Sequence, residues 1–486
     1  FLPPIVVVSL MARIALLGAS GYIGGRLLPR LIERRHDIRC LLRNPQKITV
    51  DDADHVTIFK GDVLQPETLP PVFAGADIVY YLVHSMAGGT GNFQSRDRSA
   101  AEHVAEAARA AGVRRIIYLG GLGRKDSEQT PHLRSRHEVG NILRESGIPV
   151  TEFRAAVIIG SGSAAFEMIH HLVNRLPVMI TPRWVHVRTQ PLAIADLLSY
   201  LLDAVELPAT AGQVIDIGGP EVLTYREMML TIARVLNLRR VVLPVPVLTP
   251  RLSSYWVNLV TPIPVSLARS LIESVRSETI CENDLAMRMF DIRPMRFEEA
   301  VHRALQKVRT SGVETTWTSA ESPHGPQPLD PSHFLINEQN VNSTAPPELL
   351  FRVASSIGGK NGWYYANGLW RIRGFIDKQI GGVGLRRGRR HPVELHVGEA
   401  LDFWRVEEIE SGVRMLLRAE MKVWGRAWLE FRVESTGNGG SRLIQIARYY
   451  PRGIARSPVL VRRLSAARDG VPRNGTSDCA KGGEMG

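Results

Sequence analysis

The stretch RIALLGASGYIG, residues 13–24, decides the fold of the first half of the chain. Its apolar start predicts a buried strand, and three glycines then lead into a helix. Gly18 permits a tight turn, Gly21 lets the backbone approach a pyrophosphate, and Gly24 lets helix and strand pack closely. The N–H groups and the positive dipole at the helix N-terminus favour phosphate. We therefore expect nucleotide binding at Gly18, Ser20, Gly21, Tyr22, Ile23 and Gly24.

Short apolar runs continue to alternate with helical patterns as far as residue 150, with an Ala-rich helix expected over residues 93–111. Strands alternating with helices of this length predict a parallel sheet covered by helices on both faces, which is the doubly wound α/β fold. Residues 150–310 add a smaller lobe on the substrate side. Within this lobe, Thr224 and Glu227 have the spacing of a capping box at a helix start.

The composition changes after residue 310. Residues 311–347 are rich in Ser, Thr, Pro, Asn and Gln, which predicts a linker. Residues 348–452 combine a helical segment with strict period-two alternation, which predicts an α+β domain with an antiparallel sheet. Beyond 453 we expect a disordered or atypical basic tail. At the other end, residues 1–10 precede Met11, and we expect them to be an upstream extension.

Charge is distributed unevenly along the 486 residues, whose net charge is +12. Residues 1–350 hold 36 basic and 35 acidic side chains, whereas residues 351–486 hold 24 and 13. The run at 385–391 could meet phosphates, but it lacks the interleaved aromatic residues typical of nucleic-acid binding. We therefore disfavour nucleic acid and leave open a weak membrane-surface contact through the basic C-terminal region. No apolar run reaches the roughly 20 residues of a membrane span, and a cytoplasmic protein is expected.

The three cysteines are an odd number without a paired spacing, which argues against a disulfide scaffold and against a Cys-based zinc module, and we predict no metal site. The second strand ends at Arg43 without the carboxylate that usually binds the ribose of NAD. An arginine there can pair with a 2′-phosphate, so NADP(H) is favoured, with NAD(H) left as the alternative. Asp62 and Val63, followed by Leu82 and Val83, end the next two strands and are expected around the adenine and ribose.

The segments GASGYIGG, LLRNPQK, KGDV and YLGG resemble the atypical short-chain dehydrogenase/reductase superfamily over residues 11–310. Within that superfamily, the chain is similar to the group that includes the nucleotide-holding accessory subunit of respiratory complex I. GWYYANGLWRIRG, ALDFWRV and GRAWLEF are similar to the DUF2867 type of C-terminal region. That region resembles a helix-grip domain, but such relatives continue past residue 452 in an aromatic-rich helix that this sequence lacks.

Active members of the superfamily use Ser, Tyr and Lys, and this resemblance gives the chain a degenerate site. Gly120 and Gly121 stand where the Ser is expected, His132 where the Tyr is expected, and Arg136 where the Lys is expected. A histidine can serve as acid or base, whereas an arginine binds ribose or phosphate but cannot tune a partner as lysine does. The alternative is that His132 starts a helix and Arg136 only contacts the cofactor.

Other polar residues near predicted strand ends could replace the missing acid, namely His84, Ser85 and Ser161. The superfamily's substrate-side loop is matched by Trp184, His186 and Gln190. We expect an NADP(H)-binding oxidoreductase-like protein that acts on a small apolar carbonyl compound. A non-catalytic nucleotide-binding redox sensor or assembly scaffold is the alternative, and a third hypothesis makes the C-terminal domain a lipid or polyketide carrier.

Overall fold

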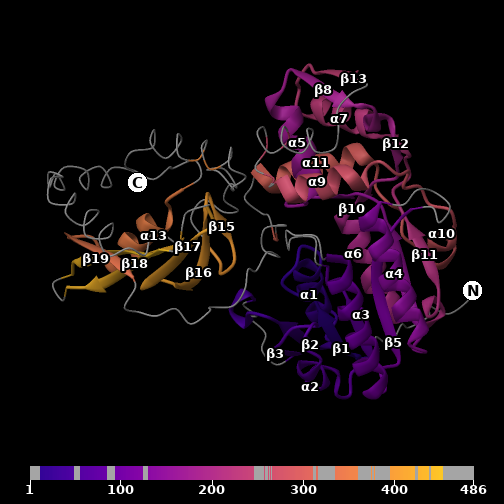
Figure 1. Cartoon of the computed structure of the whole chain (residues 1–486), viewed down its shortest axis with the longest axis horizontal. Coiled ribbons are helices and arrows are strands. Elements are labelled where there is room, and N and C mark those ends of the chain that lie inside the picture. The colour runs from indigo at the N-terminus through magenta and orange to yellow at the C-terminus, as the bar shows by residue number, and fades with distance from the viewer. Residues whose placement is uncertain are drawn as a thin grey trace, which may run out of the picture. The chain divides into compact units, whose positions relative to one another are not determined.

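The computed structural model has two compact units, Phe1–Gly325 and Pro326–Gly486 (Figure 1). It describes residues 11–48, 55–84, 93–123, 130–245, 257, 261, 263, 265–309, 314–315, 334–358, 374, 377, 395–421, 425–436 and 439–451. The predicted extension (1–10), the basic run (385–391) and the tail (453–486) lie outside these residues.

The first unit is built on a seven-stranded sheet with the order β11-β6-β5-β4-β1-β2-β3. All of its strand pairs are parallel, which confirms the predicted doubly wound sheet. The carboxyl ends of the strands therefore meet at one edge, where ligands bind in such folds. The strands are β1 (Arg13–Leu17), β2 (Asp37–Leu42), β3 (Val56–Lys60), β4 (Ile78–Tyr81), β5 (Arg115–Gly121), β6 (Val150–Ala155) and β11 (Val214–Ile217).

Alternate residues of β1 enter two different cores, because successive strand side chains point to opposite faces. Ile14 and Leu16 pack with α1 (Gly24–Glu33) and α6 (Ile194–Glu206) on one face. Ala15 and Leu17 pack with α3 (Phe93–Ala110) and α4 (Pro131–Glu145) on the other (Figure 1). Burial on both faces explains why the strand reads as a continuous apolar run.

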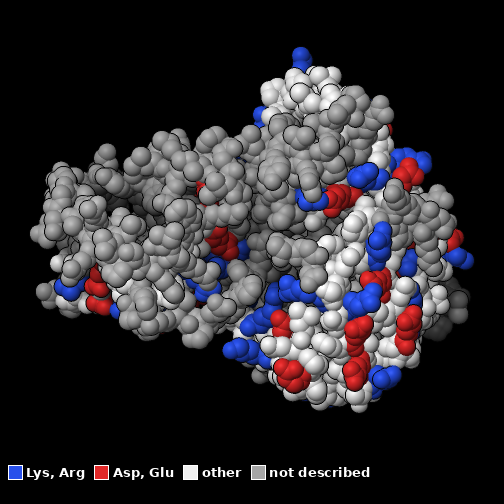
Figure 2. Space-filling model, in the orientation of Figure 1, with Lys and Arg blue, Asp and Glu red and all other residues white. Residues whose placement is uncertain are grey.

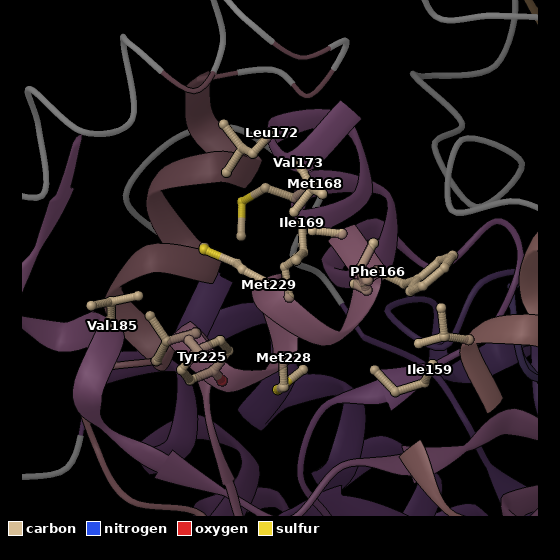
Figure 3. Close-up of a cluster of buried hydrophobic side chains, with 14 of the residues drawn as sticks. Ile159, Phe166, Met168, Ile169, Leu172, Val173, Val185, Tyr225, Met228 and Met229 are labelled. Carbon is tan, nitrogen blue, oxygen red and sulfur yellow. The ribbon is translucent and has the colours of Figure 1, made fainter. Parts of the chain in front are cut away.

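A third core lies in the smaller lobe of the first unit (Figure 3). Methionine and aliphatic side chains fill it, among them Met168, Met228 and Met229. The predicted capping box is confirmed: Thr224 Oγ1 accepts from Glu227 N at 3.2 Å, and Glu227 Oε2 accepts from Thr224 N at 2.7 Å. The main elements of this lobe are α5 (Ala164–Arg175), β8 (Val178–Pro182), α7 (Tyr225–Val235), β13 (Val241–Val245), α9 (Val265–Ser274) and α11 (Phe297–Arg309).

The second unit contains a separate six-stranded antiparallel sheet of order β14-β19-β18-β17-β16-β15. Met415 lies opposite Phe431 and Leu417 opposite Leu429, so the alternation read from the sequence gives one apolar face. Helix α13 (Pro347–Ser355) contributes to the same core. The strands are β14 (Leu335–Ser343), β15 (Ala400–Leu401), β16 (Trp404–Glu410), β17 (Arg414–Ala419), β18 (Gly425–Ser435) and β19 (Ser441–Pro451).

Strand β14 corrects the expected extent of the linker, because it falls within residues 311–347 and pairs with β19 from Leu335 to Ser343. Most of its side chains are exposed at the sheet edge, so Asn, Gln and Glu are tolerated and no apolar alternation marks the strand. On the visible face of the first unit, acidic and basic groups are interspersed (Figure 2). No helix among the described residues is long and apolar enough to cross a membrane.

Candidate functional site at the carboxyl edge of the parallel sheet

The backbone of the glycine-rich turn leaves no room for side chains at its glycines. Gly18 has φ +89°, and a Cβ there would lie 2.7 Å from the carbonyl oxygen of Leu82 on the neighbouring β4 side. A Cβ on Gly24 would overlap the carbonyl oxygen of Gly18. The turn is closed by a hydrogen bond from Gly21 N to Gly18 O of 2.9 Å. This compact cradle beside the N-terminus of α1 fits the phosphates of a dinucleotide.

Arg43 and Asp62 lie at neighbouring strand ends, because β2 and β3 pair in register and each residue follows its strand. Arg43 is exposed and follows β2 directly. Asp62 Oδ1 accepts from the backbone N of Leu64 at 3.1 Å, which holds its carboxylate at the edge. Both therefore lie on the side of the glycine-rich turn where the adenine end of a dinucleotide was expected.

The three apolar residues predicted near the cofactor occupy the same edge. Val63 is buried, and its carbonyl oxygen lies 3.1 Å from His103 Nδ1 of α3. Leu82 and Val83 follow β4 and are partly buried, each packing against a different core of the sheet. Leu82 is close enough to Gly18 to form one wall of the turn.

On the opposite side of the glycine-rich turn, the structure brings together two histidines that the sequence suggested separately. His84 follows β4 and His132 is the second residue of α4. Their ring centroids are 4.9 Å apart and the rings are tilted by 49°. His84 Nε2 and His132 Nδ1 are both buried, and neither has a hydrogen-bond partner among the residues that the structure describes. Unpaired buried polar atoms are costly, so a polar ligand group would be favoured here.

Asp97 of α3 completes this cluster. It is 4% exposed, and its Oδ2 lies 3.1 Å from His84 Nδ1. The same oxygen accepts from Ser135 Oγ of α4 at 3.1 Å. When Asp97 is ionised its oxygens only accept hydrogen bonds, and the contact then requires the proton of His84 on Nδ1. Sequence reasoning missed Asp97, although a signal existed: it shares the buried face of α3 with Ala100, Ala101, Val104 and Ala108.

The electrostatics of the cluster favour neutral imidazoles. Burial lowers the pKa of His132 well below its ordinary value, and the nearby His84 and Arg136 lower it further, while Asp97 opposes them. Burial is also the main cause that lowers the pKa of His84, followed by Arg136. A proton placed on either ring is therefore given up readily, which is the property of a strong acid.

Arg136 lies beside the glycines that replace the expected serine. The Arg136 carbonyl oxygen accepts from Tyr118 Oη at 2.8 Å, and its guanidinium carbon lies 5.9 Å from the centre of the Tyr118 ring. A Cβ on Gly121 would lie 3.8 Å from the Arg136 side chain. The end of β5 thus presents no hydroxyl, and Arg136 is placed next to the strand end where it could reach a ribose or phosphate.

The remaining predicted residues do not join this cluster by any contact among the described residues. Ser161 follows β7 (Ile158–Ile159), and its carbonyl oxygen accepts from the buried Arg26 Nη2 at 2.7 Å. Ser161 Oγ is itself buried, and no described residue forms a hydrogen bond with it. Ser85 lies outside the described residues, as does the side chain of Trp184.

His186 and Gln190 have different surroundings. His186 is exposed. Gln190 donates from Nε2 to Gly219 O at 2.7 Å and accepts at Oε1 from Cys281 N at 3.0 Å. Gln190 therefore ties two loops together. No cluster of three or more metal-ligating side chains occurs among the residues that the structure describes.

Two family models match the chain. Residues 18–159 match a family described as NAD(P)H-binding, and residues 333–455 match a protein family of unknown function, DUF2867. The fold and the glycine-rich turn define the first unit as an NAD(P)-binding Rossmann domain. The chain thus combines an NAD(P)-binding Rossmann domain with a C-terminal DUF2867 domain.

Curated relatives match only parts of the chain. Photosystem II assembly factor Ycf39 of Trieres chinensis is 22% identical over 204 residues, covering 42% of this chain and 63% of the relative. Ycf39 of Cyanophora paradoxa is 25% identical, covering 29% and 44%. A 3-beta-hydroxysteroid dehydrogenase of Mycolicibacterium neoaurum is 27% identical, covering 22% and 31%. The chain therefore spans less than two thirds of the length of each of these relatives.

Solved structures share the fold of the first unit. Triphenylmethane reductase of Citrobacter sp., in complex with NADP(H), has a TM-score of 0.50 and 20% identity, covering 60% of this chain and 99% of the reductase chain. A nucleoside-diphosphate-sugar epimerase of Staphylococcus aureus has a TM-score of 0.50 and 18% identity, with the same coverage of 60% and 99%. At this level of identity the likeness concerns the fold.

Proposed function

We propose that the first unit binds NADP(H) and reduces a small, apolar carbonyl compound, with His132 as the proton donor. The observation that carries this proposal is a pair of buried nitrogens, one on His84 and one on His132, without a hydrogen-bond partner in the described part of the chain. They lie after β4 and at the start of α4, at the sheet edge that also carries the glycine-rich turn. A hydrogen-bonding cluster of this kind next to a dinucleotide cradle is typical of a catalytic site.

The cofactor would be held by groups spread along the edge. Backbone N–H groups of the turn at Gly18–Gly24 would bind the pyrophosphate, and Arg43 would pair with the 2′-phosphate that distinguishes NADP from NAD. Asp62 would meet the adenine and Arg136 the ribose. When bound, NADPH supplies a hydride to the carbonyl carbon. The choice of NADP over NAD rests on Arg43, which stands where NAD-binding domains usually have a carboxylate.

The chain's own residues would supply the proton. Protonated His132 would give its proton to the carbonyl oxygen and return to the neutral form that its buried surroundings favour. Asp97 would act as a positioning residue, because its contact with His84 Nδ1 fixes that ring beside His132 and offsets a positive charge on the pair. Turnover should therefore rise as the pH falls, until the protein loses stability.

The test is a comparison of variants with a panel of apolar ketones and aldehydes. NADPH binding is followed by nicotinamide fluorescence, and turnover by loss of NADPH absorbance. His132→Gln should bind NADPH with a Kd within about threefold of the wild type and lose at least ~100-fold in turnover. The matched control is His302→Gln, which changes an exposed histidine on α11 and should retain both NADPH binding and turnover. Unchanged turnover in His132→Gln would remove that residue from the mechanism.

A non-catalytic nucleotide sensor or assembly factor is the second candidate. It is favoured by the absence of a hydroxyl at Gly120 and Gly121, and by relatives that are themselves called assembly factors. The same experiment separates the two functions. Tight NADPH binding without oxidation of NADPH by any compound of the panel would favour the sensor over the reductase.

A further inference from the structure

An exposed aliphatic surface lies on the smaller lobe of the first unit. Strands β8 and β13 pair in parallel, and no further strand joins this two-stranded sheet among the described residues. Four side chains on its outer face are about half exposed and form a contiguous square, since Val241 lies opposite Val178 and Leu243 opposite Ile180. We call it the aliphatic patch: Val178 (49% exposed), Ile180 (51%), Val241 (51%) and Leu243 (48%).

The inner face of the same two strands is packed. Met179 and Val242, which lie opposite each other in the register, are 1% and 5% exposed and belong to the core of the lobe shown in Figure 3. The inner residues therefore hold the sheet on the lobe while the aliphatic patch faces outward. Contiguous exposed apolar side chains of this kind mark interaction surfaces more often than isolated ones do.

The sequence around the patch contains no acidic residue. Residues 168–195, which include β8, and residues 228–272, which include β13, have neither Asp nor Glu. At the chain's average frequency, with 48 acidic residues in 486, about seven would be expected in stretches of this combined length. The same stretches carry eight arginines, namely Arg175, Arg183, Arg188, Arg234, Arg239, Arg240, Arg251 and Arg269. Three of them form ion pairs with glutamates outside these stretches, Arg188 with Glu278, Arg234 with Glu298 and Arg269 with Glu273, so the positive charge beside the patch is argued below from Arg239 and Arg240.

Arg239 and Arg240 place positive charge at one end of the patch, because they directly precede Val241. Arg240 donates from Nε to Val173 O at 2.6 Å, from Nη2 to Asn174 O at 3.2 Å and from Nη1 to Arg239 O at 3.0 Å. These acceptors are neutral carbonyls, so they fix the guanidinium without cancelling its charge. In Figure 2, basic groups border uncharged atoms at the end of the first unit that carries β8 and β13.

We propose that this face docks on an anionic lipid surface. Aliphatic side chains would enter the boundary between headgroups and acyl chains, and the flanking arginines would pair with lipid phosphates. A lipid surface fits better than an acidic protein, because the centres of protein interfaces are enriched in aromatic residues, and the aliphatic patch has none. The proposal places membrane contact on the first unit, separately from the basic C-terminal region, and does not depend on the redox chemistry.

The test uses the full chain and co-sedimentation with vesicles of phosphatidylcholine, with or without phosphatidylglycerol. The wild type should bind only the vesicles that contain phosphatidylglycerol, and less strongly as salt is raised. The double variant Ile180→Asp, Leu243→Asp should bind at least about tenfold more weakly, and Arg239→Gln about fivefold more weakly. The matched control is Val222→Asp, Met287→Asp, two exposed apolar residues of the same unit, and it should bind within twofold of the wild type.

Circular dichroism melting of each variant checks that the fold is kept, and light scattering reports the oligomeric state. Failure of the wild type to bind anionic vesicles would overturn the proposal. Equal binding by the patch variant and the control would also overturn it, because binding would then come from elsewhere, such as the basic residues of 351–486. A dimer that the patch variant converts to monomers, with vesicle binding unchanged, would identify the patch as a protein interface and refute lipid docking.

Discussion

The two sides of the sheet edge are built in different ways. Around β1, β2 and β3, the site consists of backbone held by glycines together with the exposed Arg43. Around β4 and α4, it consists of buried, charged or titratable side chains that come from three separate elements: His84, Asp97 and His132. The first side keeps the glycine pattern of NAD(P)-binding Rossmann domains. The second side has His132 and Arg136 where the resemblance to short-chain dehydrogenases led us to expect Tyr and Lys. The comparison indicates that nucleotide binding can be retained while the residues that would perform the chemistry change.

The largest expected effect comes from Gly24→Val, which tests the backbone-built side. The new side chain would overlap the carbonyl oxygen of Gly18, and relief requires helix α1 to move away from the turn. We expect the free energy of unfolding to fall by about 3 kcal/mol and NADPH affinity to fall more than ~100-fold. Chemical denaturation and fluorescence titration measure the two quantities. An NADPH affinity equal to that of the wild type would show that the turn does not hold the nucleotide.

Asp97→Asn tests the side built from buried side chains. The substitution keeps the volume but removes the charge that opposes the lowering of the His84 and His132 pKa values. We expect turnover to fall about 100-fold, its pH profile to shift to lower pH, and the Kd for NADPH to stay within threefold. Asp284→Asn, at an exposed carboxylate, serves as the control. A loss of turnover without the shift in the pH profile would reduce Asp97 to a purely structural role.

Arg43→Ala has a smaller effect, confined to one cofactor. Removing a charge-assisted contact to a 2′-phosphate should weaken NADPH binding about tenfold and leave NADH binding unchanged. NADH is therefore an internal control for the fold and for the rest of the site. If the binding of NADPH and NADH were weakened equally, Arg43 would contact a part of the cofactor that the two nucleotides share.

The smallest expected effect is on the pH dependence of the free energy of unfolding, which the variant His132→Gln tests. The folded state lowers the pKa of His132, so below the ordinary histidine pKa of about 6.5 the unfolded chain binds more protons than the folded one. Acidification through this range should thus destabilise the wild type, with little contribution from His132 at higher pH. In His132→Gln the fall between pH 7 and pH 5 should be smaller, by on the order of 1 kcal/mol. Parallel pH profiles from urea denaturation would contradict this assignment.

The difference between the two sides also explains what could be predicted from the sequence. Local signals predicted the parallel sheet, the turn at Gly18–Gly24 and the alternation in β17 and β18, because each depends on spacing within one or two elements. The contact between His84 and His132 joins residues 48 positions apart, and Asp97 enters from a third element. The only local signal for this cluster was Asp97 itself, an acidic residue on an apolar helix face. Strand β14 was missed because an edge strand needs no apolar pattern.

The most direct test of the central claim is a single-turnover experiment. The wild type and His132→Gln are each loaded with NADPH, mixed with a panel of apolar carbonyl compounds, and followed by nicotinamide fluorescence. The account predicts that both proteins bind NADPH with similar affinity and that only the wild type oxidises it rapidly. Failure of the wild type to bind NADPH, or equally rapid oxidation of NADPH by both proteins, would contradict it.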